Sequence, residues 1–208
     1  MTEKFVPNVI SIEGARVAFF RGHKAAARTG KDGKPKGDPK YSATLLLDPS
    51  NVAHAAKITE IKQEAARALN HKYGSKDKWP VNAGGAPLFL CFGLGNDLPK
   101  LGAKIYEGFA DMFYVKLSDK NRPLLGSRSG KVVVEGDPQC PYGGCYVNAK
   151  TTLYVYDNES KGVNANFRSM QFVKDGPAFG GGGARSADEE FEALEGGNDA
   201  GKDPFDVE

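Results

Sequence analysis

Hydrophobic and polar positions alternate along much of this chain, and the pattern predicts a fold built mainly from short strands. Residues 9–20 form the first predicted strand, with Gly14 as a bulge or break, and residues 41–47 form the strand that returns beside it. The sequence predicts further strands at residues 88–92, 106–117, 131–135, 146–156 and 166–174. The 26 glycines and 12 prolines of the chain are typical of a turn-rich β protein.

One segment has the period of a helix instead. Asp48 followed by Pro49 predicts its start, because aspartate caps helices and proline is tolerated at the first helical position. Gly74 predicts its end. We expect its apolar stripe to face the core, where a helix of this size can plug one end of a small barrel. The stripe recurs at steps of three and four residues and consists of Val52, Ala55, Ile58, Ile61, Ala65 and Leu69.

The strand predicted at residues 146–156 carries tyrosines on one face. Side chains alternate across a strand, so the opposite face holds Val147, Ala149, Thr151, Leu153 and Val155. The tyrosine face holds Tyr146, Asn148, Lys150, Thr152, Tyr154 and Tyr156. Exposed rings of this kind suit the flat bases of single-stranded nucleic acid, each of which stacks for about 1–3 kcal/mol. Alternatively, the tyrosines pack beneath a loop or against a second subunit.

The charge of the chain is divided between two opposed segments. Residues 186–208 hold nine acidic side chains and one lysine, whereas the preceding residues hold 27 Lys and Arg against 17 Asp and Glu. A basic body attracts polyanions, of which nucleic acid is the commonest. The glycine run at residues 180–183 predicts a hinge, and an acidic tail beyond it could occupy the nucleic-acid groove or contact partners. The alternative is that the tail only keeps the protein soluble.

The basic residues of the body gather in two connections between strands. Residues 21–40 contain seven cations, and their glycines and prolines predict a long irregular loop rather than a regular element. Residues 120–131 form a second basic connection. Each is either a solvated turn or a phosphate-binding loop, and the density of cations in the first favours phosphate contact at least equally.

Enzymatic chemistry has no counterpart in this sequence. The three histidines are scattered, the glycine run opens no helix, and no phosphate-binding loop is present. Cys140 and Cys145 form a single loose pair, while a zinc site needs two further ligands. We therefore expect no catalytic residue, no cofactor and no metal, and a protein that is not an enzyme. No signal peptide and no stretch of ~20 apolar residues is visible, so we expect a soluble protein in a reducing cytoplasm.

The C-terminal third carries a recognisable series of motifs. It reads Gly-Cys-Tyr-Val-Asn-Ala at residues 144–149, Tyr-Asp-Asn at 156–158 and Met-Gln-Phe-Val-Lys-Asp-Gly at 170–176, followed by the glycine run. This series resembles the signature of a group of phage-encoded single-stranded-DNA-binding proteins that was long catalogued only as a domain of unknown function. Residues 41–51 and 106–115 also resemble that group, so the resemblance covers most of residues 14–183.

The resemblance implies a mainly β, OB-fold-like five-stranded Greek-key barrel with one inserted α-helix and a disordered acidic C-terminal tail. It divides the chain into a DNA-binding domain at residues 1–179 and a Gly-rich hinge with the acidic tail at 180–208. It also implies a protein that coats single-stranded DNA without sequence preference during phage replication or recombination, in the cytoplasm of the infected bacterial host. The alternative is a protein-interaction or structural phage component whose tyrosine strand is a subunit interface.

The candidate site combines the basic connections with the aromatic strand faces. Which face of residues 166–174 is exposed stays open, as does the formation of a homo-oligomer. Replication or recombination proteins are expected to contact the tail through Phe191, Asp203, Phe205 and Asp206. The expected DNA contacts are Arg21, Lys24, Arg28, Lys34, Lys36, Tyr114, Lys116, Arg122, Arg128, Lys131, Tyr146, Lys150, Tyr154, Tyr156, Arg168, Phe172 and Lys174.

Overall fold

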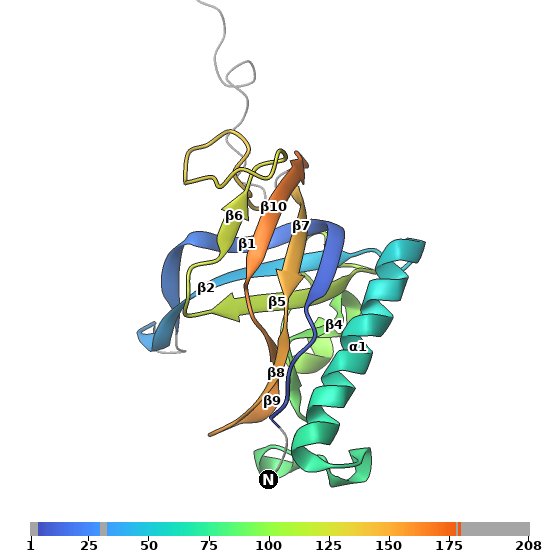
Figure 1. Ribbon diagram of the computed structural model, residues 1–208. Coiled ribbons are helices and arrows are strands. Elements are labelled where there is room, and N and C mark those ends of the chain that lie inside the picture. Colours follow the sequence, from blue (N-terminus) through green and yellow to red (C-terminus); the bar gives the residue numbers. More distant parts are fainter. Residues whose placement is uncertain (1–3, 30–32, 178, 180–208) are drawn as a thin grey trace, which may run out of the picture.

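The computed structural model describes residues 4–29, 33–177 and 179, and strands dominate this part of the chain (Figure 1). One α-helix is present there, α1 (Val52–Tyr73), together with short 3-10 turns at Lys76–Lys78, Ala83–Gly85 and Gly95–Leu101. The strands are β1 (Ile10–Thr29), β2 (Pro35–Leu47), β3 (Phe89–Leu90), β4 (Phe92–Leu94), β5 (Phe113–Asp119), β6 (Leu124–Gly126), β7 (Tyr146–Thr151), β8 (Leu153–Asp157), β9 (Lys161–Ala165) and β10 (Ser169–Lys174).

The strands close into a barrel. β1 pairs antiparallel with β2 on one edge and with β7 on the other, β2 pairs with β5, β5 with β9, and β9 with β8. The ring closes because β7 and β8 are separated only by Thr152 and so form one path through the chain. β10 and β6 extend the sheet beyond β7, and β4 adds to β5. The mainly β, OB-fold-like barrel predicted from the sequence is therefore confirmed.

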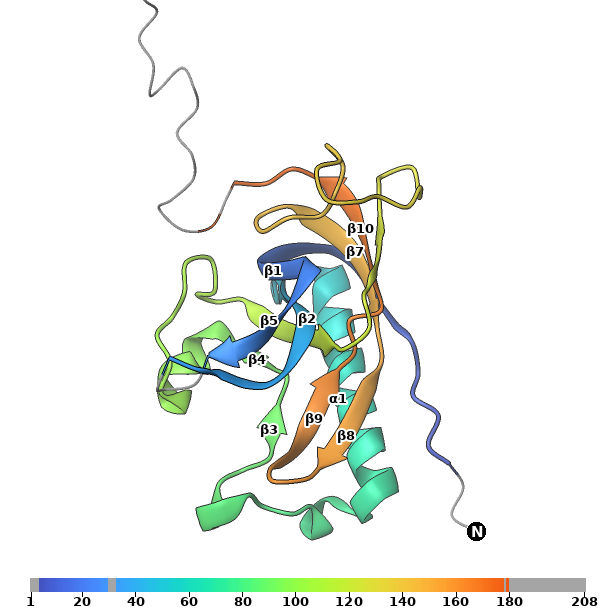
Figure 2. The same ribbon diagram turned by 90° about the vertical axis from the view of Figure 1, so that its left-hand side faces the viewer.

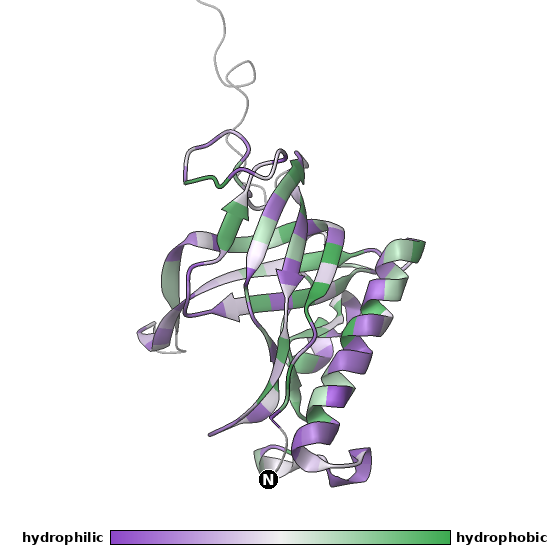
Figure 3. Cartoon of the chain, in the orientation of Figure 1, coloured by the Kyte–Doolittle hydropathy of each residue, from purple (hydrophilic) through white to green (hydrophobic). Residues whose placement is uncertain are grey.

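Helix α1 covers one side of the barrel (Figures 1 and 2). Its predicted stripe is confirmed at Ile58, Ile61, Ala65 and Leu69, which are buried, whereas Val52 at the first turn is 86% exposed. Figure 3 shows mainly hydrophilic residues on the visible side of the helix. No helix within the described residues is long and apolar enough to cross a membrane.

The predicted start of the helix was wrong by one turn. The carboxylate of Asp48 accepts hydrogen bonds from the backbone N–H and hydroxyl of Ser50, so it forms a local turn before the helix. Asn51 is the cap, because its side-chain oxygen accepts hydrogen bonds from the N–H groups of Ala53 and His54. The predicted end is confirmed at Gly74, where φ is +89°.

The sequence pattern predicted most of the strands correctly, but several predicted strand ends were wrong. The bulge at Gly14 is confirmed by a register shift between Ile12 and Ala15 and by a φ of +64°. The strand predicted at 106–117 begins only at Phe113, because the preceding residues form a loop in which Asp111 has a φ of +60°. The strand predicted at 131–135 is reduced to one isolated bridge, between Val132 and Gly126.

The strand predicted at 146–156 divides at Thr152. The carbonyl of Thr152 accepts the backbone N–H of Asn166, and its hydroxyl accepts a hydrogen bond from the Asn166 side chain. These bonds fix the joint between β7 and β8. They also hold Asn166 in the connection between β9 and β10, where it is not part of a strand. The predicted strand at 166–174 therefore begins at Ser169, and β9 and β6 are strands that the sequence pattern did not predict.

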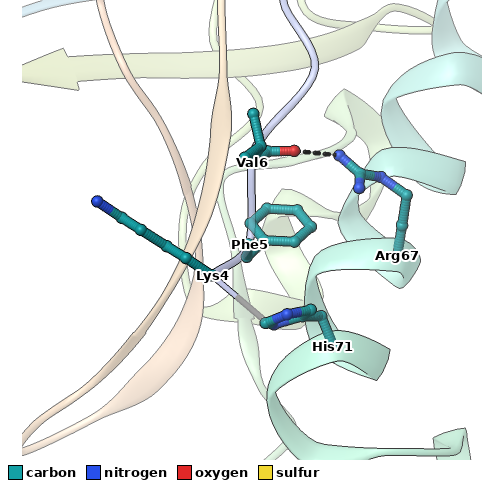
Figure 4. A pocket seen from close by; sticks show the side chains of 5 residues that line it. All are labelled: Lys4, Phe5, Val6, Arg67 and His71. Atoms are coloured by element: carbon teal, nitrogen blue, oxygen red, sulfur yellow. Dashed lines mark hydrogen bonds between the residues drawn. The ribbon is translucent and has the colours of Figure 1, made fainter. Parts of the chain in front are cut away.

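The N-terminal segment is held to α1 by a buried carboxylate. Glu64 is 4% exposed and accepts hydrogen bonds from the backbone and side-chain nitrogens of Asn8, while Arg67 forms two further bonds to it at 2.8 Å. Arg67 also donates to the carbonyl of Val6 and lies 4.4 Å over the ring of Phe5 (Figure 4). Burial alone would raise the pKa of Glu64, but the hydrogen bonds from Arg67 and Asn8 outweigh it and lower the pKa below its ordinary value of 4.5.

We predict that Glu64→Gln lowers the free energy of unfolding by about 1–3 kcal/mol at pH 7, because a neutral amide replaces the charged acceptor of Asn8 and Arg67. A carboxylate with a lowered native pKa stabilises the fold above the pKa of the unfolded chain and loses this effect as pH falls through the native pKa. The difference between the two proteins should therefore shrink in urea unfolding at pH 3. The control is Glu60→Gln, which removes the surface pair with Lys57 and should change stability by less than about 0.5 kcal/mol. An equal loss at both pH values would contradict the assignment.

Candidate nucleic-acid interface

The first basic connection is a β-ribbon and not the irregular loop that the sequence predicted. β1 and β2 stay paired out to Thr29 and Pro35, and the ribbon projects from the barrel at the left of Figure 1. Register shifts along β1 and a φ of +78° at Gly37 let the strands pair despite the glycines and prolines. Four of the predicted contacts, Arg21, Lys24, Lys34 and Lys36, are exposed on this ribbon, which we call the basic ribbon.

An ion pair joins the basic ribbon to the loop that follows β5. The ammonium group of Lys120 contacts the carboxylate of Asp38. The hydrogen bond and charge of Lys120 lower the pKa of Asp38. Both side chains are about two-thirds exposed, so the pair orients the ribbon more than it stabilises the fold.

A line of polar side chains crosses the outer surface of the barrel. Strand register places Arg21 opposite Ser42, Ser42 opposite Ser118, and Asn164 opposite Tyr154. Ser118 and Asn164 connect β5 to β9, because the Asn164 amide donates to the Ser118 hydroxyl at 3.0 Å. We call these five residues on β1, β2, β5, β9 and β8 the polar row.

Tyr154 and Lys116 belong to this outer surface, as the sequence predicted. The Asn164 amide also donates to the Tyr154 hydroxyl at 2.7 Å, which fixes the half-buried ring in one orientation. Lys116 is exposed two residues before Ser118 on β5, and its ammonium lies 5.1 Å from the centre of the Tyr114 ring. A cation therefore lies beside the middle of the polar row, and a fixed aromatic ring forms its β8 end.

Two further aromatic residues, Tyr156 and Phe89, continue this surface beyond Tyr154. Tyr156 is paired with Gly162, and a Cβ placed on Gly162 would lie 2.7 Å from the Tyr156 hydroxyl and 2.2 Å from the carbonyl oxygen of Phe89. The Tyr156 ring and the β3 backbone therefore both close over the glycine. Phe89 is 55% exposed beside them. Phe89, Ser118 and Asn164 were not among the contacts predicted from the sequence, because β3 has only two residues and because lone uncharged polar side chains on β5 and β9 carry little signal.

The other predicted contacts lie on a different part of the surface. Tyr146 and Lys150 are on β7, whose neighbours are β1 and β10, so they do not lie on a strand next to β5, which carries Lys116. Lys174 on β10 lies 4.8 Å over the Tyr146 ring, and Ser169 faces Lys150. Figure 2 shows β7 and β10 on one side of the barrel and β4 and β5 on the other. The exposed cations of this second surface are Lys150, Arg168 and Lys174, with Arg122, Arg128 and Lys131 around β6.

With this geometry established, comparison with known proteins identifies the family. Residues 8–201 match the family described as the ssDNA-binding protein of Enterobacter phage Enc34. The chain belongs to this family. A relative, putative protein p50 of Acyrthosiphon pisum secondary endosymbiont phage 1, is 35% identical over 187 residues, which are 89% of this chain and 93% of the relative.

Solved structures of the Enc34 protein share the fold. The single-stranded DNA-binding protein from bacteriophage Enc34 in complex with ssDNA has a TM-score of 0.62 and 24% identity, covering 86% of this chain and 97% of its own. A second structure of the single-stranded DNA-binding protein from bacteriophage Enc34 has a TM-score of 0.61 and 22% identity, covering 91% of this chain and all of its own. The family match over residues 8–201 and the 35% identical relative confirm the phage family that the C-terminal motifs indicated.

Two aromatic contacts predicted for this member of the Enc34 family are wrong. Phe172 is 6% exposed and lies in the main core, so the exposed side chains of its strand segment are Arg168 and Lys174. Tyr114 is 2% exposed and packs with Leu46, Leu98 and Phe109 in a second apolar cluster. Tyr114 points away from the barrel interior, as predicted, but the loop that contains Phe109 covers it. Burial raises the pKa of the Tyr114 hydroxyl.

The cysteines of this family member are buried, and their thiols stay protonated. Burial raises the pKa of Cys91 to about 12 and that of Cys145 to about 11. Cys140 lies 3.5 Å from the Nε2 atom of His23. Across the described residues, no group of three or more His, Cys, Asp or Glu side chains could hold a metal ion. The side chain of Arg28 and the tail residues Phe191, Asp203, Phe205 and Asp206 lie outside the described residues.

We predict that Gly162→Ala disrupts the aromatic surface. The new methyl group would collide with the Phe89 carbonyl and with Tyr156, and overpacking of this kind costs about 1–3 kcal/mol of stability. The matched control is Gly143→Ala, because a Cβ there meets no atom within 4 Å. Thermal unfolding of both variants provides the measurement. Equal stability of the two variants would contradict the tight packing over Gly162.

Proposed function

We propose that this protein binds single-stranded DNA without sequence preference and coats it during phage replication or recombination, in the cytoplasm of the host. The observation that carries the proposal is the polar row on an OB-type barrel, with the basic ribbon at one end and Tyr154, Tyr156 and Phe89 at the other. OB folds bind oligonucleotides on this kind of surface, between strand faces and a projecting loop. Membership of the Enc34 family supports the same function.

Two interactions would supply the affinity for single-stranded DNA. Cations on the basic ribbon neutralise phosphates and release counterions, while the aromatic rings stack on bases. The Asn164 amide is already bonded to Ser118 and Tyr154, so its two donors are not available to read the edge of a base. A surface built from bonded amides, rings and lysines favours single strands over duplex and makes little distinction between bases.

We predict tight, salt-sensitive binding of the purified protein to labelled poly-dT, with matched duplex bound much more weakly. The affinity should fall with salt at a slope of about 0.7 per phosphate contacted. Fluorescence anisotropy at two salt concentrations measures this, with an RNA of equal length as a third ligand. Adding Mg²⁺ or Mn²⁺ to the same mixture should leave the strand intact, because we infer stoichiometric binding. Cleavage by the pure protein, or no binding at low salt, would overturn the proposal.

Two matched variants locate the interface within the same experiment. Lys116→Ala removes an exposed lysine beside the polar row, and Lys150→Ala removes one from the β7 surface. We expect Lys116→Ala to weaken binding and reduce the salt slope by about 0.7, with a much smaller effect of Lys150→Ala. The reverse result would move the interface to β7 and β10, and loss of self-association without loss of binding would make Tyr146 and its neighbours a subunit contact.

We further propose that the folded domain ends at Phe179 and that the acidic tail from residue 186 competes with DNA and contacts replication partners. The guanidinium of Arg16 lies 3.8 Å from the Phe179 ring centre and donates to the carbonyl of Pro177 at 2.6 Å. Phe179 is partly buried and packs against the second apolar cluster, as Tyr106 and Met112 do. The chain thus enters the hinge next to the outer surface of β1, from which a tethered polyanion could reach the basic ribbon.

We predict that truncation after residue 179 tightens binding to poly-dT at low salt, because a competing polyanion is removed. The control keeps the tail length and replaces its nine acidic residues with Asn and Gln, which should have the same effect as truncation. Anisotropy titrations of the three proteins compare the affinities. Equal affinity with and without the tail would remove the competition, and tightening by truncation alone would indicate exclusion by chain bulk instead of charge.

A further inference from the structure

Phe19 is an exposed aromatic side chain at a bulge in β1. Between the pairs Ala18–Thr44 and Arg21–Ser42, β1 has two residues where β2 has one, and the first of the two is Phe19 with a φ of +49°. The bulge sends the two neighbouring rings in opposite directions. Phe20 packs against the main core, whereas Phe19 is 55% exposed. The extra residue therefore re-aims one phenylalanine onto the outer surface.

The backbone conformation of Phe19 is unfavourable for a bulky residue. A left-handed φ is uncommon outside glycine, asparagine and aspartate, and it persists only where the surrounding structure enforces it. Strain of this kind concentrates at ligand-binding positions. Packing alone does not explain this backbone conformation, because Phe19 as a residue is 55% exposed to water.

Two other aromatic rings pack against Phe19 and hold its ring in position. Tyr106 meets it edge-on at 4.9 Å with an interplanar angle of 81°, and Phe109 lies 5.7 Å away in a tilted arrangement. Phe109 is buried and Tyr106 is half-buried, so Phe19 is the exposed member of a three-ring cluster. A flat ligand placed on the exposed side of Phe19 would stack on a ring that Tyr106 and Phe109 already hold in position.

We propose that Phe19 is a base-stacking residue of the interface and that the β1 bulge is the device that presents it. The inference rests on the proposed function. Arg21, two residues further along β1, lies at the end of the polar row and is exposed. A base stacked on Phe19 would place its phosphate within reach of Arg21 and of the basic ribbon. The β1 end of the interface thereby gains an aromatic platform to match Tyr154 and Tyr156 at the other end.

A fluorescence experiment tests contact directly. The chain has one tryptophan, Trp79, which donates a hydrogen bond to Asn70 near the end of α1 and can be replaced by phenylalanine to give a dark background. In that background, Phe19→Trp should be strongly quenched when poly-dT is added. The control Phe5→Trp, in the pocket beside α1 (Figure 4), should not be quenched. Absence of quenching at position 19 while DNA is bound would overturn the proposal.

Affinity measurements provide the second test. Loss of one stacked base corresponds to about a 5- to 150-fold weaker affinity, so Phe19→Ala should bind poly-dT that much more weakly at every salt concentration, with an unchanged salt slope. Phe19→Tyr should restore binding, and Phe5→Ala should leave it unchanged. Failure of the wild-type protein to bind would overturn the proposed function itself. Normal binding by a folded Phe19→Ala, or a change only in sedimentation behaviour, would overturn the stacking role alone.

Discussion

The fold depends on a single change of partner within one chain segment. Residues 146–151 pair with β1 and β10, and residues 153–157 pair with β9, so the ring of strands closes at Thr152. Asn166 holds this joint through the backbone and the side chain of Thr152. Without the change of partner, β8 and β9 could not reach β5, and the polar row would end at Ser118.

The same joint decides how the tyrosines are distributed. Tyr146 and Tyr154 both lie on the outward side of the chain, but the change of partner at Thr152 places them in different parts of the same sheet, Tyr146 beside β1 and β10 and Tyr154 beside β9. Side-chain alternation is a local property and was predictable from the sequence, as were the stripe of α1 and the bulge at Gly14. Partner exchange is not local, because it depends on a hydrogen bond to a residue 14 positions away. The division of the candidate site between two surfaces could therefore not be predicted from spacing.

Contacts with distant segments explain the remaining differences between the sequence-based predictions and the structure. Tyr114 lies on the outward face of β5, but it is covered by a loop whose Phe109 has no pattern linking it to that strand. The basic ribbon shows the opposite effect. Its glycines and prolines favour an irregular loop, yet bulges absorb the irregular residues while the pairing of β1 with β2 continues. In both cases tertiary contacts override local propensity, and they do so where the candidate interface is formed.

The resulting surface combines rigid and mobile groups in a way that suits binding without sequence preference. The aromatic side chains are fixed before any ligand arrives, Tyr154 by Asn164, Tyr156 over Gly162, and Phe19 by Tyr106. Pre-organised rings lose little side-chain entropy on binding, so more of the stacking energy remains as affinity. The lysines of the basic ribbon sit on long flexible side chains, which can follow phosphates whose positions vary from one sequence to the next. In the proposed interface, the rigid rings would therefore stack on bases and the adaptable charges would follow phosphates, the two features that nucleotides of every sequence share.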